Sequence, residues 1–201
     1  MSQEPESIAL RFSKEQKAQM KDNFLFVKVK DKTLQRLAAY FSNWTNCPDF
    51  IVDKTGELDA LKSPYLEVAI PRKPLETEDH NLIGFEEWDK RIRKYKEGIG
   101  IENIKVVIAD PNTYAQVFID QQANIGKTPI TKLQGTNGIR ELQWLGGVPT
   151  SSVAGNGRRV YFSVHLTDTI SGESYHGPHF TTHESVDKFK TALPVIIPTM
   201  A

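Results

Sequence analysis

The segment that most constrains the fold lies near the C-terminus, where apolar and polar residues alternate strictly over eight positions. A period of two is typical of a β-strand with one buried face. The segment is followed by Ile170-Ser171-Gly172. A three-residue loop that ends on glycine suits a hairpin, because its last position needs a positive φ. We therefore predict a β-hairpin whose first strand buries Val160, Phe162, Val164 and Leu166.

The predicted turn also fixes which residues face each other across the hairpin. Phe162 is then opposite Phe180, so that apolar positions meet apolar positions. His165 is opposite Gly177 and diagonal to His179 on the polar face, at about 7–8 Å between backbones. The sequence thus predicts that two histidines share one face of the hairpin.

A helix is expected after the second strand of the hairpin. Thr181 and Glu184 have the spacing of a capping box. Apolar residues follow at helical spacing, and Pro194 would end the helix. The predicted helix therefore extends to residue 193 and buries one stripe, made of Val186, Phe189 and Leu193.

The two predicted strands carry two copies of His-x-Thr, namely His165-Leu166-Thr167 and His179-Phe180-Thr181. Residues i and i+2 of a strand face the same way, so each copy presents an imidazole beside a hydroxyl. Two such pairs can act as general base and general acid on a phosphodiester. The pattern resembles the motif of the 2H phosphoesterases. In that family the two motifs lie far apart in sequence, one in each lobe of a repeated fold, whereas here they lie on one hairpin. The candidate catalytic residues are His165, Thr167, His179 and Thr181.

Two other interpretations of the histidines stay open. The short spacing of His176, His179 and His183 suits zinc, copper or nickel, with His165 reaching across the strands. The predicted register, however, divides these histidines between two faces, and no cysteine joins them. Alternatively, the polar positions form an ordinary solvated sheet face. We favour this last interpretation and expect neither a metal nor a cofactor.

The strongest local charge signal lies in a helix expected over residues 85–97. Five of seven consecutive residues there are basic, and Trp88 and Tyr95 lie close enough to stack on a ligand. Acidic residues open this helix and basic residues close it, which the helix dipole also favours, so a plain solvated helix is the alternative. A loop predicted over residues 148–157 leads into two further arginines. The predicted binding residues, for a nucleic acid or a protein partner, are Lys90, Arg91, Arg93, Lys94, Arg158 and Arg159.

Composition limits the other classes of function. The 25 basic residues equal the 25 acidic residues, so no overall field attracts nucleic acid or membrane. Cys47 is the only cysteine, which rules out a disulfide framework. No run of about 18 apolar residues occurs and no targeting segment is evident. We expect a cytoplasmic protein without membrane contact, and the sequence does not determine its oligomeric state.

Two further capping patterns complete the expected fold. Ser13 and Gln16 form a capping box, and Asp110 with Pro111 opens a helix over residues 111–123 after a buried strand. A short apolar strand at residues 195–197 is expected to join the sheet.

We predict a single α+β domain over residues 8–201, mostly an antiparallel sheet with helices chiefly on one face. Residues 1–7 are expected to be disordered, and any internal seam lies near residues 71–80. The leading function is a non-enzymatic binding module, with the histidine-bearing enzyme as the alternative.

Overall fold

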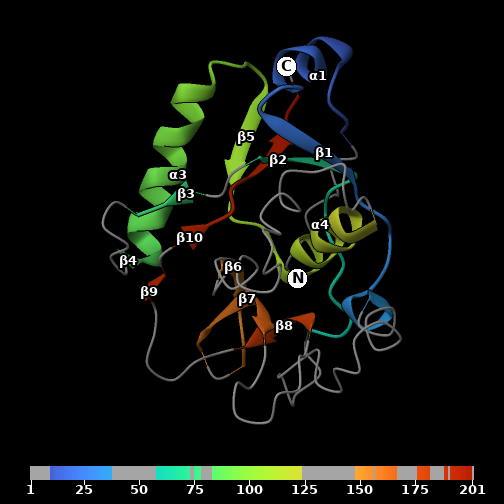
Figure 1. The fold of residues 1–201 in the computed structure, drawn as a ribbon, viewed down its shortest axis with the longest axis vertical. Helices are drawn as coiled ribbons and strands as arrows, with labels where there is room; N and C mark the ends of the chain where they lie inside the picture. The colour runs from blue at the N-terminus through green and yellow to red at the C-terminus, as the bar shows by residue number, and fades with distance from the viewer. Residues whose placement is uncertain are drawn as a thin grey trace, which may run out of the picture.

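The computed structural model describes residues 10–37, 58–72, 75–77, 83–123, 148–155, 157–166, 176–181, 188–189 and 191–200. Its centre is a four-stranded antiparallel sheet (Figure 1). In spatial order the strands are β1 (Phe24–Lys28), β2 (Glu67–Pro71), β11 (Val195–Pro198) and β5 (Ile104–Val107). The fold is therefore mixed α and β with an antiparallel sheet, as predicted, and the expected C-terminal strand joins it.

A second antiparallel sheet has the order β6 (Val148–Val153), β7 (Arg159–Leu166) and β8 (His176–Thr181). The register of β7 and β8 is the predicted one, with Phe162 opposite Phe180 and His165 opposite Gly177. The predicted turn set this register and the apolar alternation agreed with it, because a one-residue slip would move every apolar side chain to the other face. The turn itself lies outside the described residues.

Two of the predicted helix starts, at Ser13 and at Asp110, are confirmed. Helix α1 (Lys14–Met20) begins with the expected capping box, in which Ser13 Oγ accepts from Gln16 N at 3.1 Å and Gln16 Oε1 accepts from Ser13 N at 2.9 Å. Helix α4 (Pro111–Ala123) begins after Asp110, whose Oδ1 accepts from Thr113 N at 2.9 Å. Each cap satisfies an N–H group that the first helical turn leaves without a partner.

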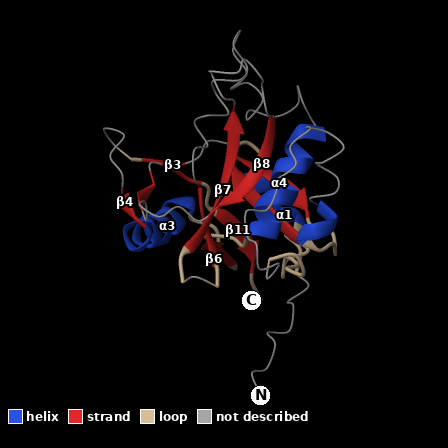
Figure 2. Cartoon of the chain, turned by 90° about the horizontal axis from the view of Figure 1, so that it is seen from below, coloured by secondary structure: helices blue, strands red, loops and turns tan. Residues whose placement is uncertain are grey.

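The four-stranded sheet has apolar packing on both faces. On one face α4 and the second sheet meet β2 and β11 through Tyr114, Val68 and Val195. On the other face α1 and α3 (Phe85–Ile99) meet Ala69 and Ile196 of the same strands. Figures 1 and 2 show α3 and α4 well separated in both views. The expectation that the helices pack chiefly on one face is therefore not confirmed.

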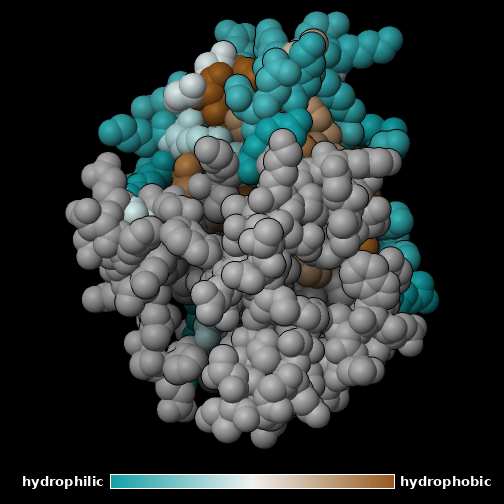
Figure 3. All heavy atoms as spheres, viewed as in Figure 1, coloured by the Kyte–Doolittle hydropathy of each residue, from teal (hydrophilic) through white to brown (hydrophobic). Residues whose placement is uncertain are grey.

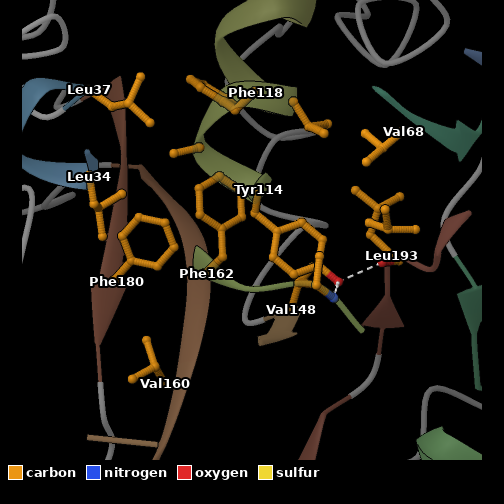
Figure 4. Close-up of a cluster of buried hydrophobic side chains, with 14 of the residues drawn as sticks. Leu34, Leu37, Val68, Tyr114, Phe118, Val148, Val160, Phe162, Phe180 and Leu193 are labelled. Carbon is orange, nitrogen blue, oxygen red and sulfur yellow. Dashed lines mark hydrogen bonds between the residues drawn. The ribbon is translucent and has the colours of Figure 1, made fainter. Parts of the chain in front are cut away.

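An aromatic cluster joins α4 to the hairpin (Figure 4). The ring of Phe162 lies 5.3 Å from that of Phe180, 6.1 Å from Tyr114 and 6.0 Å from Phe118, measured between centroids. The Tyr114 hydroxyl donates to Leu193 O at 2.7 Å and accepts from Ala109 N at 3.3 Å. Burial and these contacts fix the hairpin against the main sheet.

The predicted helix over residues 181–193 is wrong in its second half, whereas residues 182–187 lie outside the described residues. Two short strands occupy part of it, β9 (Lys188–Phe189) and β10 (Thr191–Ala192). Strand β9 pairs with β4 (Ile83–Gly84), and β10 pairs with β3 (Leu75–Glu76). Pairing with segments far away in the sequence overrides a helical periodicity that rested on three residues.

The predicted loop over residues 148–157 is also wrong at its beginning, since β6 occupies residues 148–153. Val148 and Thr150 are fully buried, and Thr150 Oγ1 donates to Val160 O at 2.7 Å. The register shifts between Pro149 and Val153, and β6 lies at the edge of its sheet, where a proline is tolerated. The residues of this segment are mostly small or polar, so their composition did not predict a strand.

Residues 1–7, expected to be disordered, lie outside the described part of the chain. Within the described part, no helix is both long enough and apolar enough to cross a bilayer.

Candidate binding surface

Helix α3 carries four of the predicted binding residues, and its buried side fixes where they lie. Trp88 and Ile92 are almost fully buried against the sheet. The helix ends at Ile99, two residues beyond the expected end at residue 97, because Gly100 adopts the left-handed conformation with φ 65°. The remaining faces of α3 carry its charged residues.

A shallow groove of about 270 Å³ lies between α3 and β3, and we refer to it as the β3 groove. One α3 stripe forms most of it, and Leu75 of β3 contributes apolar surface. Arg91 and Lys94 place cationic groups at this groove. Its lining residues are Leu75, Trp88, Arg91, Lys94 and Tyr95.

The β3 groove has a largely apolar lining and contains one cation, that of Lys94, without an ion pair. The Arg91 guanidinium lies 5.7 Å from the Trp88 ring centroid and 3.6 Å from a Glu87 oxygen. Lys94 has no ion-pair partner among the described residues. Burial raises the pKa of Tyr95 above its ordinary value, so its hydroxyl stays protonated at neutral pH. An acidic group that reaches Lys94 would meet an uncompensated positive charge.

The other basic residues of α3 turn away from the β3 groove. Arg93 pairs with Asp89 at 2.6 Å, and Lys90 lies 3.9 Å from Glu87. Arg93 and Lys96 line a second, larger groove of about 890 Å³ beside β5, which we refer to as the β5 groove. In Figure 3 the described surface over α1 and α3 is mostly hydrophilic, with a smaller hydrophobic patch between them. The predicted basic patch is thus divided around the helix rather than gathered on one face.

The predicted arginine pair lies at the start of β7. The Arg159 guanidinium is 3.5 Å from the ring centroid of Phe85, the first residue of α3, and its Nη1 donates to Thr150 O at 3.1 Å. The backbone oxygen of Arg158 accepts from Ala154 N at 2.8 Å. The structure brings Arg159 to the N-terminal end of α3, where its observed contacts are internal.

The predicted catalytic residues lie on the hairpin. The ladder places Ser163 opposite His179 and Tyr161 opposite Thr181, so positions 161, 163, 165, 179 and 181 share one face by alternation. Thr167 lies outside the described residues. No group of three or more potential metal-binding side chains comes together in the described part of the chain.

The contribution of Leu75 was not anticipated, because residues 71–79 have the composition of a loop. The only sequence signal is the apolar residue between Pro74 and Glu76, which is too weak to indicate a two-residue strand. Comparisons with protein-family models, with curated proteins and with solved structures found no match to this chain.

Proposed function

We propose that this protein is a binding module for a protein partner, and that the β3 groove receives an acidic segment of that partner. The observation that carries the proposal is the position of Arg91 and Lys94 beside an apolar groove on an exposed helix. A segment with acidic residues around one apolar side chain would complement both features.

The size of the groove favours a single anchor. A volume of about 270 Å³ accommodates one large side chain rather than an extended ligand. Interfaces commonly draw most of their affinity from one or two such buried anchors surrounded by weaker polar contacts. Leu75 and Tyr95 supply the anchor contacts, and Lys94 supplies the charge.

The same geometry argues against nucleic acid. Trp88 has no exposed surface, so it cannot stack on a base. Three of the basic residues on α3 lie close to acidic residues of the same helix, which reduces the field that phosphates would meet. The chain as a whole has no net charge.

The first prediction concerns Lys94 and Tyr95. We expect Lys94→Glu to weaken binding of an acidic peptide with one central leucine roughly fivefold, because an attraction becomes a repulsion at a solvated site. Tyr95→Ala should weaken it about tenfold by removing anchor contacts. Fluorescence anisotropy of the labelled peptide measures both.

The matched control is Lys96→Glu, which makes the same charge change on the same helix but in the β5 groove. It should change affinity for this peptide by less than about twofold, since exposed charges separated by about a Debye length are screened. Equal effects of the two charge reversals would contradict a site at the β3 groove. Salt-sensitive binding of a short single-stranded DNA, together with no binding of the acidic peptide, would favour a nucleic-acid partner instead.

A second candidate function is supported by the observed register of β7 and β8, in which His165 is opposite Gly177 and Ser163 is opposite His179. By strand alternation, positions 165 and 179 belong to one face, as a phosphodiester-processing site would need. His165→Ala and His179→Ala should then each abolish hydrolysis of a cyclic or linear phosphodiester. Absence of turnover by the unaltered protein across a nucleotide panel would remove this candidate.

A further inference from the structure

We infer that the outer edge of β5 is a docking site for an extended segment of a partner protein, which would add to the sheet as a fifth strand. An acidic residue of that segment would lie opposite Lys105. This site does not depend on the β3 groove.

The direction of the backbone groups of β5 follows from one hydrogen bond. Thr199 N donates to Asn103 O at 2.9 Å, and these residues continue the ladder in which Ile197 is opposite Lys105 and Val195 is opposite Val107. Backbone groups of successive strand residues point to opposite edges. Lys105 and Val107 therefore bond to β11, whereas Ile104 and Val106 direct their N–H and C=O groups to the outer edge.

Pro198 agrees with this assignment. It lies opposite Ile104 and has no N–H to offer β5. Within the described residues, β5 pairs with β11 alone, and no other backbone bond is made by Ile104 or Val106. Unpaired backbone groups along a strand edge are a ready template for another strand.

The space beside this edge is an open groove, bounded by α3 on its far side. The β5 groove of about 890 Å³ is lined by residues of β5, by the start and end of α3, and by the turn that joins them. Figure 1 shows α3 and β5 running side by side. A helix beside an open strand edge leaves room for one extended chain, whose side chains would alternate between α3 and the opposite face.

The β5 groove is lined by three acidic and three basic residues, so the charge that selects the occupant is the one directly opposite an added strand, at Lys105. Lys105 is exposed and has no ion-pair partner among the described residues. A directly opposed acidic residue stabilises an antiparallel strand pair, whereas a like charge destabilises it. A lysine on an edge strand also discourages pairing with uncharged strands. The preferred partner segment is therefore one with an aspartate or glutamate at this position.

A second copy of the chain satisfies this condition poorly. In such a dimer, the outward backbone groups of Ile104 and Val106 would bond to the outward groups of the copy, which also belong to even-numbered residues. Lys105 would therefore face an odd-numbered residue of the copy. Those residues are Ile101, Asn103, Lys105 and Val107, and none of them is acidic. Partner addition is favoured over self-pairing for this reason.

Hydrogen exchange of single amides, measured by NMR on the full chain, tests the proposal. In the free protein, the Lys105 and Val107 amides should be protected and the Ile104 and Val106 amides should exchange faster. A short peptide that alternates valine and glutamate, added at ten times its Kd, should slow exchange of the Ile104 and Val106 amides roughly tenfold. A valine and lysine peptide should bind about fivefold less tightly.

Two variants of the probe and of the protein distinguish strand addition from charge attraction alone. Two peptides are compared, one N-methylated at its odd-numbered residues and one at its even-numbered residues. The peptide whose methyl groups block the amides that bond to β5 should lose binding, and the other should keep it. Lys105→Glu should reverse the preference between the glutamate and lysine peptides. The control Lys28→Glu makes a charge reversal on β1, at the opposite edge of the same sheet, and should leave both affinities within about twofold.

Equal loss of binding with both N-methylation phases would overturn the inference, because strand addition uses only alternate amides. So would absence of binding by the glutamate peptide at millimolar concentration. Protection of the Ile104 and Val106 amides that grows with protein concentration, accompanied by dimers in sedimentation, would show that the occupant is a second copy.

Discussion

Asp110 shows how one residue can serve structure at an electrostatic cost. Its carboxylate caps α4 and accepts hydrogen bonds from the Thr113 backbone and hydroxyl, and that hydroxyl lies 2.6 Å from Ser63 Oγ. Burial nevertheless raises the pKa of Asp110, because loss of hydration outweighs the hydrogen bonds that lower it. Burial raises the pKa of Tyr65 to about 12, and the negative charge of Asp110 adds to this rise.

This balance predicts how substitutions at Asp110 behave. Asp110→Ala should lower the free energy of unfolding by about 1–2 kcal/mol, since the cap is lost, whereas asparagine keeps a capping oxygen. The folded protein holds the Asp110 proton more tightly than the unfolded chain. The contribution of Asp110 to the free energy of unfolding therefore falls as pH rises from the ordinary pKa of 3.8 through the raised value. Asp110→Asn should accordingly gain stability relative to the unaltered protein over that range. Urea unfolding at several pH values measures this, and a constant difference between the two proteins would contradict it.

At the scale of elements, the hairpin is attached to the main sheet by aromatic packing rather than by shared strands. Phe162 and Phe180 are paired across β7 and β8, and Phe162 packs on Tyr114 and Phe118 of α4. Described strands of the two sheets do not pair with each other, although Ser151 N donates to Ala109 O at 2.8 Å. The aromatic cluster is therefore the main connection between the two sheets.

Truncating this cluster should be costly. Phe180 is 1% exposed, and Phe180→Ala should reduce the free energy of unfolding by about 3–5 kcal/mol through lost burial and a remaining cavity. Val153 of β6 is 51% exposed, so Val153→Ala should change it by less than about 0.5 kcal/mol. Thermal unfolding followed by circular dichroism compares the two. Similar effects would show that the cluster contributes little.

For the molecule as a whole, the four-stranded sheet couples two apolar cores. Neighbouring residues of β11 face opposite sides, with Val195 in the core of α4 and Ile196 in the core of α3. Glu67 of β2 is also buried, and it accepts from Lys17 Nζ at 2.7 Å and from Phe12 N at 3.1 Å. The central strands thus pack against side chains on both faces of the sheet, and neither core is complete without them.

We therefore predict cooperative unfolding. Ile196→Ala should lower the free energy of unfolding by about 2–5 kcal/mol, and Val195→Ala should lower the midpoint of the same transition. Tryptophan fluorescence and far-ultraviolet circular dichroism in urea should report coincident curves for both variants. Two separated transitions in either variant would show that the cores unfold independently.

The sequence alone determined the features that depend on neighbours along the chain. The caps of α1 and α4 depend on side chains within three residues of the helix start, and the β7–β8 register was predicted from a short turn together with alternation. The basic residues of α3 could be named in advance for the same reason.

Only the tertiary structure decided the pairings between distant segments and the surfaces that they create. Residues 188–189 and 191–192 became strands because β4 and β3 offered partners, and Leu75 reached α3 through one of those pairs. The division of the basic residues between two grooves depends on what packs beside α3, and the open edge of β5 depends on which strand ends the sheet. Short strands have little preference of their own, so their structure is set by the partners that folding brings to them.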